Sequence, residues 1–190
     1  MQKQEIVAQL QHIERTYTLS VMAMGVFQDS RIGDLLKGKT TYLVREFLES
    51  DEGQVRVEGF KMGLEQMGQT ILDGGAKQQQ ALDEFGKAAL RTLIKDSFEC
   101  IKGYSEETGQ APSFRAQDWY QFARMVRNSL SHDYCFRFNT HDRTLLPVTW
   151  RDRTISVSMD NLPMELSLLD HGRSFALFSA IRAFAVDDLA

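Results

Sequence analysis

This sequence predicts a mainly helical fold with one small β-hairpin near the C-terminal end. Apolar residues recur at steps of three and four along much of the first two thirds of the chain, which is the period of an amphipathic helix. Strand-like alternation becomes clear only after residue 136, and only three prolines interrupt the 190 residues. We therefore expect residues 1–190 to form a single helical domain, with a hairpin at about residues 145–159 inserted before the last helix.

The first helix is expected over residues 2–28, where a continuous apolar stripe runs along the chain. Its members are Ile6, Leu10, Ile13, Tyr17, Val21 and Met24. A second helix is expected over about residues 31–50, although polar residues 37–41 interrupt the pattern. Its apolar members are Ile32, Leu35, Leu36, Leu43, Val44, Phe47 and Leu48.

Glycines concentrate in residues 53–86, which hold seven of the thirteen in the chain. Because each glycine lowers helix stability, this stretch is expected to form a broken helix with a turn at Gly74 and Gly75. A strong amphipathic helix is expected over residues 81–107, ended by Gly109. Its inward face is expected to carry Leu82, Phe85, Ala89, Leu93, Phe98 and Ile101.

Residues 119–138 again show helical periodicity. On a wheel of about 100° per residue, one buried stripe stands out. It consists of Trp119, Ala123, Val126 and Leu130. After residue 136 the period becomes that of strands, and residues 151–153 fall at a turn of the expected hairpin. A last helix is expected from residue 162 or 173 to residue 187.

The composition is that of a globular protein, with 43% hydrophobic and 25% charged residues. The N-terminus lacks the apolar core of a secretory signal, and no segment approaches the ~20 apolar residues of a membrane span. We expect a cytoplasmic protein that does not bind a membrane. Two cysteines, Cys100 and Cys135, are too few for a disulfide framework and lack the spacing of metal ligands.

Positive charge is concentrated in one segment of an otherwise acidic chain. The net charge is -4, yet residues 115–153 hold seven arginines, no lysine and four aspartates, a local charge of +3. The guanidinium group presents a planar fork of donors that matches phosphate oxygens, so an arginine cluster favours an anionic partner. A solvated protein face is the alternative explanation, and charge alone does not separate the two.

The expected helix at residues 119–138 has an unusual polar face. It is formed by Arg124, Arg127, Asn128, Ser131 and His132. His132 points away from the buried stripe, and Asn128, four residues before it, is a neighbour able to hydrogen-bond to its imidazole. On a continuous helix Arg127 lies about 140° round from His132, so one helix does not easily aim both groups at one phosphate. This geometry indicates that two copies of the chain meet there.

The string Arg127-Asn128-Ser129-Leu130-Ser131-His132 resembles the Arg-x4-6-His signature of the HEPN superfamily, in which a polar residue, often asparagine, follows the arginine. With Asp133 and Tyr134 it is also similar to the Arg-x4-His-x-Tyr form of HEPN toxins that pair with nucleotidyltransferase antitoxins. The resemblance covers about residues 119–136 and the helical character of the rest. It implies a HEPN-like helical bundle and a ribonuclease of a toxin or antiphage-defence system.

HEPN nucleases cut RNA without a metal ion, and the resemblance implies a role for each matching residue. His132 would deprotonate or position the 2'-hydroxyl, and Arg127 would hold the scissile phosphate and stabilise its developing charge. Asn128 would orient His132 or the phosphate. The residues expected to bind RNA around them are Arg124, Ser131 and Arg137. The sequence shows no carboxylate cluster and no His/Cys set with metal spacing, and no metal or cofactor is expected.

The expected partner is RNA, with tRNA among the candidates, cut to 2',3'-cyclic phosphate and 5'-hydroxyl ends. A homodimer with a composite active site is expected, with Arg127 of each chain near His132 of the other. Tyr134 stands where the resembling toxins carry a tyrosine that a partner enzyme adenylylates. It is therefore a candidate modification site, and an antitoxin or nucleotidyltransferase is a candidate partner. A tyrosine that packs where the helix ends is the alternative.

Two other interpretations stay open. In the first, a HEPN module binds RNA, nucleotide or a protein partner through the same arginine and histidine without cutting. In the second, the protein is a helical scaffold and residues 127–132 are a solvated helix end. Cleavage of RNA by the purified protein in EDTA separates the nuclease from both, and an RNA-dependent mobility shift separates the binding module from the scaffold. The remaining histidines, His12, His141 and His171, are interpreted as surface or packing residues.

Overall fold

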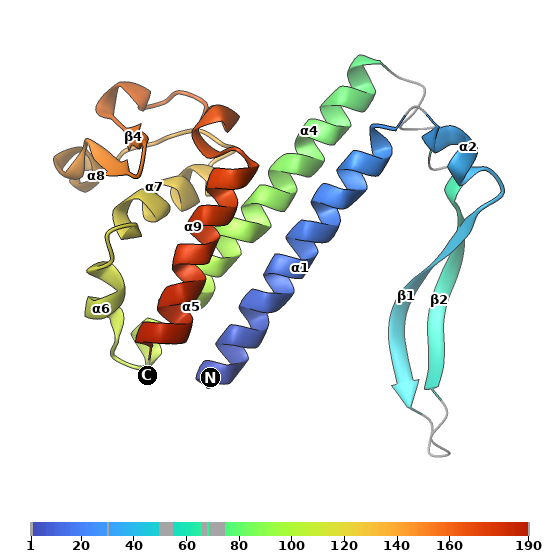
Figure 1. Ribbon diagram of the computed structural model, residues 1–190, viewed down its shortest axis with the longest axis horizontal. Helices are drawn as coiled ribbons and strands as arrows, with labels where there is room; N and C mark the ends of the chain where they lie inside the picture. The colour runs from blue at the N-terminus through green and yellow to red at the C-terminus, as the bar shows by residue number, and fades with distance from the viewer. Residues whose placement is uncertain (1, 30, 50–54, 66–67, 69–74, 190) are drawn as a thin grey trace. The chain divides into compact units, whose positions relative to one another are not determined.

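The computed structural model of the chain describes residues 2–29, 31–49, 55–65, 68 and 75–189. These residues form a mainly helical fold with two antiparallel sheets of two strands each (Figure 1). The chain comprises two compact units. The first unit comprises residues 1–21 and 87–190, and the second comprises residues 22–86.

Two long helices lie side by side in the first unit. Helix α1 (Lys3–Phe27) carries part of the predicted apolar stripe into the core of this unit. Helix α9 (His171–Ala183) continues directly into the π-helix η4 (Phe184–Asp188). An ion pair joins them, with 3.0 Å between Nη1 of Arg182 and Oε2 of Glu14. The buried members of the stripe on α1 are Ile6, Leu10, Ile13 and Tyr17.

The helix expected at residues 81–107 is present and begins earlier. It is one continuous helical run, formed by α4 (Ala76–Arg91), the π-helix η1 (Thr92–Asp96) and α5 (Ser97–Glu107). The run ends where Gly109 takes a φ of +73°, a left-handed conformation that glycine adopts without the strain of a Cβ atom. The predicted C-terminal boundary of this helix is therefore confirmed.

One residue on the predicted inward face of this run is misplaced. Phe85 is 41% exposed, so the prediction that it is buried is wrong. The other predicted inward residues are all buried, namely Leu82, Ala89, Leu93, Phe98 and Ile101. An exposed phenylalanine among charged neighbours satisfies the helical period, and the period alone does not show how wide the buried face is.

Three shorter helices follow, namely α6 (Ala111–Arg115), α7 (Tyr120–Ser131) and α8 (Thr140–Leu145). A capping box fixes the start of α8. The side chain of Asn139 accepts the backbone N–H of Asp142 at 2.8 Å, and the Asp142 carboxylate accepts the N–H of Asn139 at 3.2 Å. Helix α7 packs against η1 and α5.

The predicted C-terminal hairpin is confirmed, in a shorter form. Strand β3 (Val148–Trp150) pairs antiparallel with β4 (Arg153–Ile155), ahead of α9. Arg151 adopts a φ of +51° in the turn that joins them. The 3-10 helices η2 (Val157–Met159) and η3 (Leu166–Leu169) then lead to α9.

An aromatic cluster lies at the centre of the first unit. The ring centroid of Phe114 lies between 4.9 and 5.7 Å from those of four other aromatic residues. These are Phe98, Trp119, Tyr120 and Phe184, so the cluster joins α5, α6, α7 and η4. The stripe predicted for α7 is also confirmed, because Trp119, Ala123, Val126 and Leu130 are at most 3% exposed. This packing leaves the opposite side of α7 for polar residues.

The second unit holds a long hairpin that the sequence analysis did not predict. Strand β1 (Thr40–Glu49) pairs antiparallel with β2 (Val55–Gly63) (Figure 1). The register of the pairing shifts between Val44 and Glu46. The helix expected at residues 31–50 is therefore wrong beyond α2 (Ile32–Leu36). Residues 40–47 are rich in threonine, valine and aromatic types, which favour strands when a second strand supplies the hydrogen bonds.

The broken helix expected at residues 53–86 is also wrong where β2 lies. Glycine lowers the stability of a helix and of a strand alike, so the frequency of glycine in residues 53–86 did not distinguish a broken helix from a strand. Of the predicted turn, Gly74 lies outside the described residues, and Gly75 stands in a turn with a φ of +41°.

Candidate functional site

Helix α7 ends earlier than the sequence predicted, at the residues of interest. Its last helical residue is Ser131, and His132 follows with a φ of -118° and a ψ of 53°. The N–H of His132 bonds to the Ser129 carbonyl at 3.0 Å, three residues back rather than four. Asp133 and Tyr134 then adopt positive φ values of 52° and 60°, which are uncommon outside glycine. The chain therefore leaves the helix axis in a tight turn.

The imidazole of His132 is exposed at this turn. Among the described residues it has no hydrogen-bond or ion-pair partner. The bond between Asn128 and His132 that helical spacing would allow is not formed, because the helix ends between them. Asn128 Oδ1 instead accepts a hydrogen bond from Nη1 of Arg127 at 2.8 Å. The angle of about 140° between Arg127 and His132 assumed a continuous helix, so it does not describe this site.

Arg127 is held by a neighbouring helix. Its guanidinium forms an ion pair with Glu99 of α5, and its side chain is 27% exposed. Burial lowers the pKa of Arg127, because the charged form loses part of its hydration. Arginine still carries its charge at neutral pH. The Glu99 carboxylate thus fixes a cation close to the end of α7. The sequence showed only that an acidic residue lies on the predicted helix at residues 81–107, and not that it would pair with Arg127.

Arg124 and Ser131 serve the local structure. Nη2 of Arg124 lies 2.7 Å from Oδ1 of Asp142, whose side chain is only 3% exposed. Nε of Arg124 also donates to Gln121 Oε1 at 2.9 Å. The Ser131 hydroxyl donates to the Arg127 carbonyl at 3.0 Å. These contacts tie α7 to α8 and close its last turn, and neither side chain is left fully available to a ligand.

The arginine-rich segment is largely neutralised by carboxylates. Five of its seven arginines form ion pairs, which join Arg115 to Glu106, Arg124 to Asp142, Arg127 to Glu99, Arg143 to Asp160 and Arg153 to Asp152. Arg151 lies over the ring of Trp150, with 4.7 Å between Cζ and the centroid. The side chain of Arg137 is exposed and has no partner among the described residues. The positive surface is therefore smaller than the local charge indicated.

Tyr134 is buried, with 6% of its surface exposed. Its hydroxyl donates to the Lys87 carbonyl, and the Arg91 guanidinium lies 5.5 Å from its ring centroid. Arg91 also donates through Nε to the Leu130 carbonyl at 3.0 Å. Tyr134 and Arg91 together hold the turn after α7 against the end of α4. These contacts agree with the alternative interpretation of Tyr134, a tyrosine that packs where the helix ends.

The chemistry of this site rests on one imidazole, one paired guanidinium and one amide. Within the described ranges no group of three or more His, Cys, Asp or Glu residues is placed to hold a metal ion. None of the helices in the described part of the chain combines the length and apolar character of a membrane span. Comparisons with protein-family models, curated proteins and solved structures find no match to this chain.

Proposed function

We propose that this chain is a HEPN-type endoribonuclease with a HEPN-like bundle, acting without a metal ion in a toxin or antiphage-defence system. The observation that supports the proposal is the end of α7. There the exposed imidazole of His132, which has no partner among the described residues, follows five residues after Arg127, whose guanidinium Glu99 holds partly exposed. An imidazole that can act as a base and a fixed cation are the groups that transesterification of RNA requires.

The reaction needs only these groups. The imidazole of His132 takes the proton of a 2'-hydroxyl, and the 2'-oxygen attacks the neighbouring phosphorus. The bond from phosphorus to the 5'-oxygen breaks, and the leaving oxygen takes a proton from a water molecule, to which the protonated His132 returns the proton that it took. The products are a 2',3'-cyclic phosphate and a 5'-hydroxyl. Arg127 donates to the phosphate oxygens and stabilises the charge that develops on them.

Glu99 has two effects on Arg127 in this proposal. It positions the guanidinium, and it also competes with phosphate for the donors of that group. Arginine has five N–H donors, and the contacts with Glu99 and Asn128 use only part of them. Nε of Arg127 is buried, so the donors proposed to reach RNA are the remaining protons of its two terminal nitrogens. Asn128 acts on Arg127 rather than on His132.

A homodimer with a composite site belongs to the proposal. Its support comes from charge rather than from the helical angle. Within one copy most arginines of residues 115–153 already have carboxylate partners, so this segment of a single chain offers RNA few free cations. Two copies that meet at the end of α7 would combine the Arg127 and Arg137 side chains of both, with His132 of one near Arg127 of the other.

A nucleotidyltransferase antitoxin that modifies Tyr134 is part of the same proposal. The buried hydroxyl of Tyr134 donates to the Lys87 carbonyl, so the turn at Asp133 and Tyr134 must open before the hydroxyl can react. Mass spectrometry after co-expression with a neighbouring nucleotidyltransferase tests this step. An unmodified Tyr134 in that experiment would remove the toxin subfamily from the proposal.

The function is tested with the purified chain on total RNA and on tRNA in EDTA, with mapping of the new ends. We expect cleavage that leaves 2',3'-cyclic phosphate and 5'-hydroxyl ends. A module that binds RNA, nucleotide or a protein partner without cutting is the second candidate, because Glu99 already occupies part of the Arg127 guanidinium that cleavage requires. An RNA-dependent mobility shift without any cleavage would assign that candidate and reject the nuclease.

A further inference from the structure

A cavity of about 330 Å³ lies beside the β3–β4 hairpin of the first unit, on residues that the proposed nuclease does not use. Its apolar wall is formed by Phe136, Met159, Leu162, Pro163 and Leu168. Charged and polar residues on its other side include Asp152, Arg153, Glu165 and Ser167. The lining is about half apolar and half polar or charged, and the volume lies in the range of small-molecule sites.

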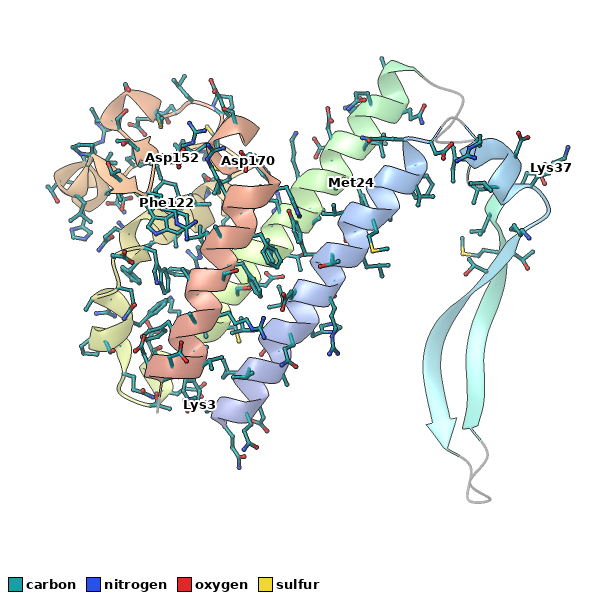
Figure 2. All side chains as sticks on the ribbon, in the orientation of Figure 1. Lys3, Met24, Lys37, Phe122, Asp152 and Asp170 are labelled. Atoms are coloured by element: carbon teal, nitrogen blue, oxygen red, sulfur yellow. The ribbon has the colours of Figure 1, made fainter. Side chains whose placement is uncertain are left out.

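One carboxylate of this cavity already has its partners. Asp152 Oδ2 lies 2.9 Å from Nη2 of Arg173, and Arg173 also pairs with Asp170. Figure 2 shows Asp152 and Asp170 close together near the start of α9. The hydrogen bond from Arg173 lowers the pKa of Asp152, so this carboxylate stays ionised at neutral pH. Asp152 therefore supplies negative charge without needing a ligand.

Two groups of opposite charge in the same lining keep free positions. Glu165 accepts the Ser167 hydroxyl through Oε2 at 3.0 Å, and its Oε1 has no partner among the described residues. Arg153 has Nε 3.6 Å from Asp152, while its two terminal nitrogens have no partner in the described part of the chain. The Arg153 side chain is 35% exposed. The cavity thus offers one carboxylate oxygen, one guanidinium edge and an apolar wall.

The balance of charge decides between ligand classes. A purely anionic ligand, such as a phosphate, would satisfy Arg153 but would meet the carboxylates of Asp152 and Glu165. A purely cationic ligand would satisfy Glu165 but would leave the Arg153 edge unpaired. A ligand that carries one group of each sign satisfies both, and charge-assisted hydrogen bonds are the strongest available to it.

We propose that this cavity binds a small zwitterion with an apolar body, the chemistry of a free apolar amino acid such as leucine, methionine or phenylalanine. Its carboxylate pairs with the terminal nitrogens of Arg153, and its ammonium group pairs with Glu165. Its side chain packs against Phe136, Leu162 and Leu168. This site is separate from His132 and Arg127, and the proposal does not depend on ribonuclease activity.

The proposal is tested by isothermal titration of the full chain with leucine, methionine and phenylalanine. We expect at least one of them to bind with a dissociation constant of about 1 mM or tighter. For the amino acid that binds, the analogue without the amino group and the analogue without the carboxylate are titrated next. Each analogue is expected to bind at least about tenfold more weakly, because each leaves one charged group of the cavity unpaired.

Charge-removing variants provide the second arm. Glu165→Gln and Arg153→Gln are expected to weaken binding at least about tenfold, whereas Arg15→Gln and Asp187→Asn, on exposed residues outside the cavity, leave it unchanged. If Arg153→Gln unfolds, Glu165→Gln and the analogues on the wild-type protein still decide, because the amide that replaces the carboxylate keeps an acceptor for Ser167. Three results would each overturn the proposal. They are absence of binding at roughly 10 mM ligand, analogues that bind as well as the amino acid, and a Glu165→Gln protein with wild-type affinity.

Discussion

His132 and Arg127 differ in how firmly the fold holds them. The imidazole is exposed and free among the described residues, whereas the guanidinium is fixed by Glu99 and Asn128. A general base must approach the proton that it abstracts, so freedom of its side chain is compatible with its role. A group that stabilises developing charge works best when it is already oriented. The two residues therefore suit the roles that the HEPN resemblance implies for them.

The first prediction concerns His132. We expect His132→Ala to abolish RNA cleavage while the free energy of unfolding changes by less than about 0.5 kcal/mol, because the side chain is exposed. Cleavage rates and thermal denaturation measure the two effects. His141→Ala, another exposed histidine, is the matched control and should cut normally. A His132→Ala protein with full activity would rule out the proposed mechanism.

The second prediction separates a structural arginine from an exposed one. Arg124→Ala leaves the carboxylate of Asp142, 3% exposed, without its cation, and should lower the free energy of unfolding by about 3 kcal/mol. Arg137→Ala should change it by less than about 0.5 kcal/mol, because the residue is exposed and unpaired within the described residues. Urea denaturation measures both. Equal stability of the two variants would contradict the assigned role of the Arg124–Asp142 pair.

The third prediction concerns the two thiols. Burial raises the pKa of Cys100 to about 11, and its Sγ donates to Gln9 Oε1 at 3.3 Å, so its thiol stays protonated at neutral pH. At about pH 8 iodoacetamide should therefore alkylate Cys135, which is less buried, before Cys100. Mass spectrometry of the peptides measures the order. Equal rates in the folded protein would show that Cys100 is not protected.

The same shift sets a pH dependence. The folded protein keeps the Cys100 proton up to about 11, whereas an unfolded thiol releases it near the ordinary value of 9.0. The unfolded chain thus binds fewer protons between these values, so the contribution of Cys100 to stability is lost as pH rises through this window. Between these two pH values the denaturation midpoint of Cys100→Ala should therefore fall less than that of the wild-type protein.

At the scale of elements, the turn after α7 depends on packing. Asp133 and Tyr134 adopt left-handed backbone conformations that cost energy in residues other than glycine. The buried ring of Tyr134, its hydrogen bond to Lys87 and its contact with Arg91 stabilise this turn. The local sequence therefore did not decide where α7 ends, because the contacts that favour the turn come from α4.

The fourth prediction tests this arrangement. Tyr134→Phe keeps the ring and loses one hydrogen bond, so it should lower the free energy of unfolding by about 1 kcal/mol. Tyr134→Ala also leaves a cavity and should cost about 3 kcal/mol or more. Urea denaturation of the two variants measures the difference. If both variants cost the same, the ring does not hold the turn.

At the scale of the whole molecule, the assembly and the charge decide whether RNA can bind. The chain has a net charge of -4, and most arginines of residues 115–153 are paired with carboxylates. Attraction of RNA then depends on gathering the remaining cations. A dimer does so without any change in the fold of either copy.

The fifth prediction follows from a shared site. Mixing an inactive Arg127→Ala chain with an inactive His132→Ala chain should restore part of the activity once subunits exchange, because one site of the heterodimer keeps both residues. RNA affinity should also fall as salt rises. Light scattering at the assay concentration is the control. A protein that is monomeric there and still cuts RNA would disprove the composite site.

Some of this architecture was predictable because it depends on local periodicity. The stripes on α1, α5 and α7, the glycine that ends α5 and the short C-terminal hairpin all follow from residues close in sequence. The β1–β2 hairpin was not predictable in this way. Its apolar residues also fit helical spacing, and its pairing joins residues as distant as Thr40 and Gly63.

The sequence by itself determined that the chain is mainly helical, which face of α7 is buried and which polar residues occupy its end. A helix supplies its own hydrogen bonds, so a local pattern is enough to specify it. Only the tertiary structure decided where α7 ends, that Arg127 pairs with Glu99 and Arg124 with Asp142, and that a cavity forms beside β3 and β4. Each of these depends on side chains from distant segments, and no spacing in the sequence records which of them will meet.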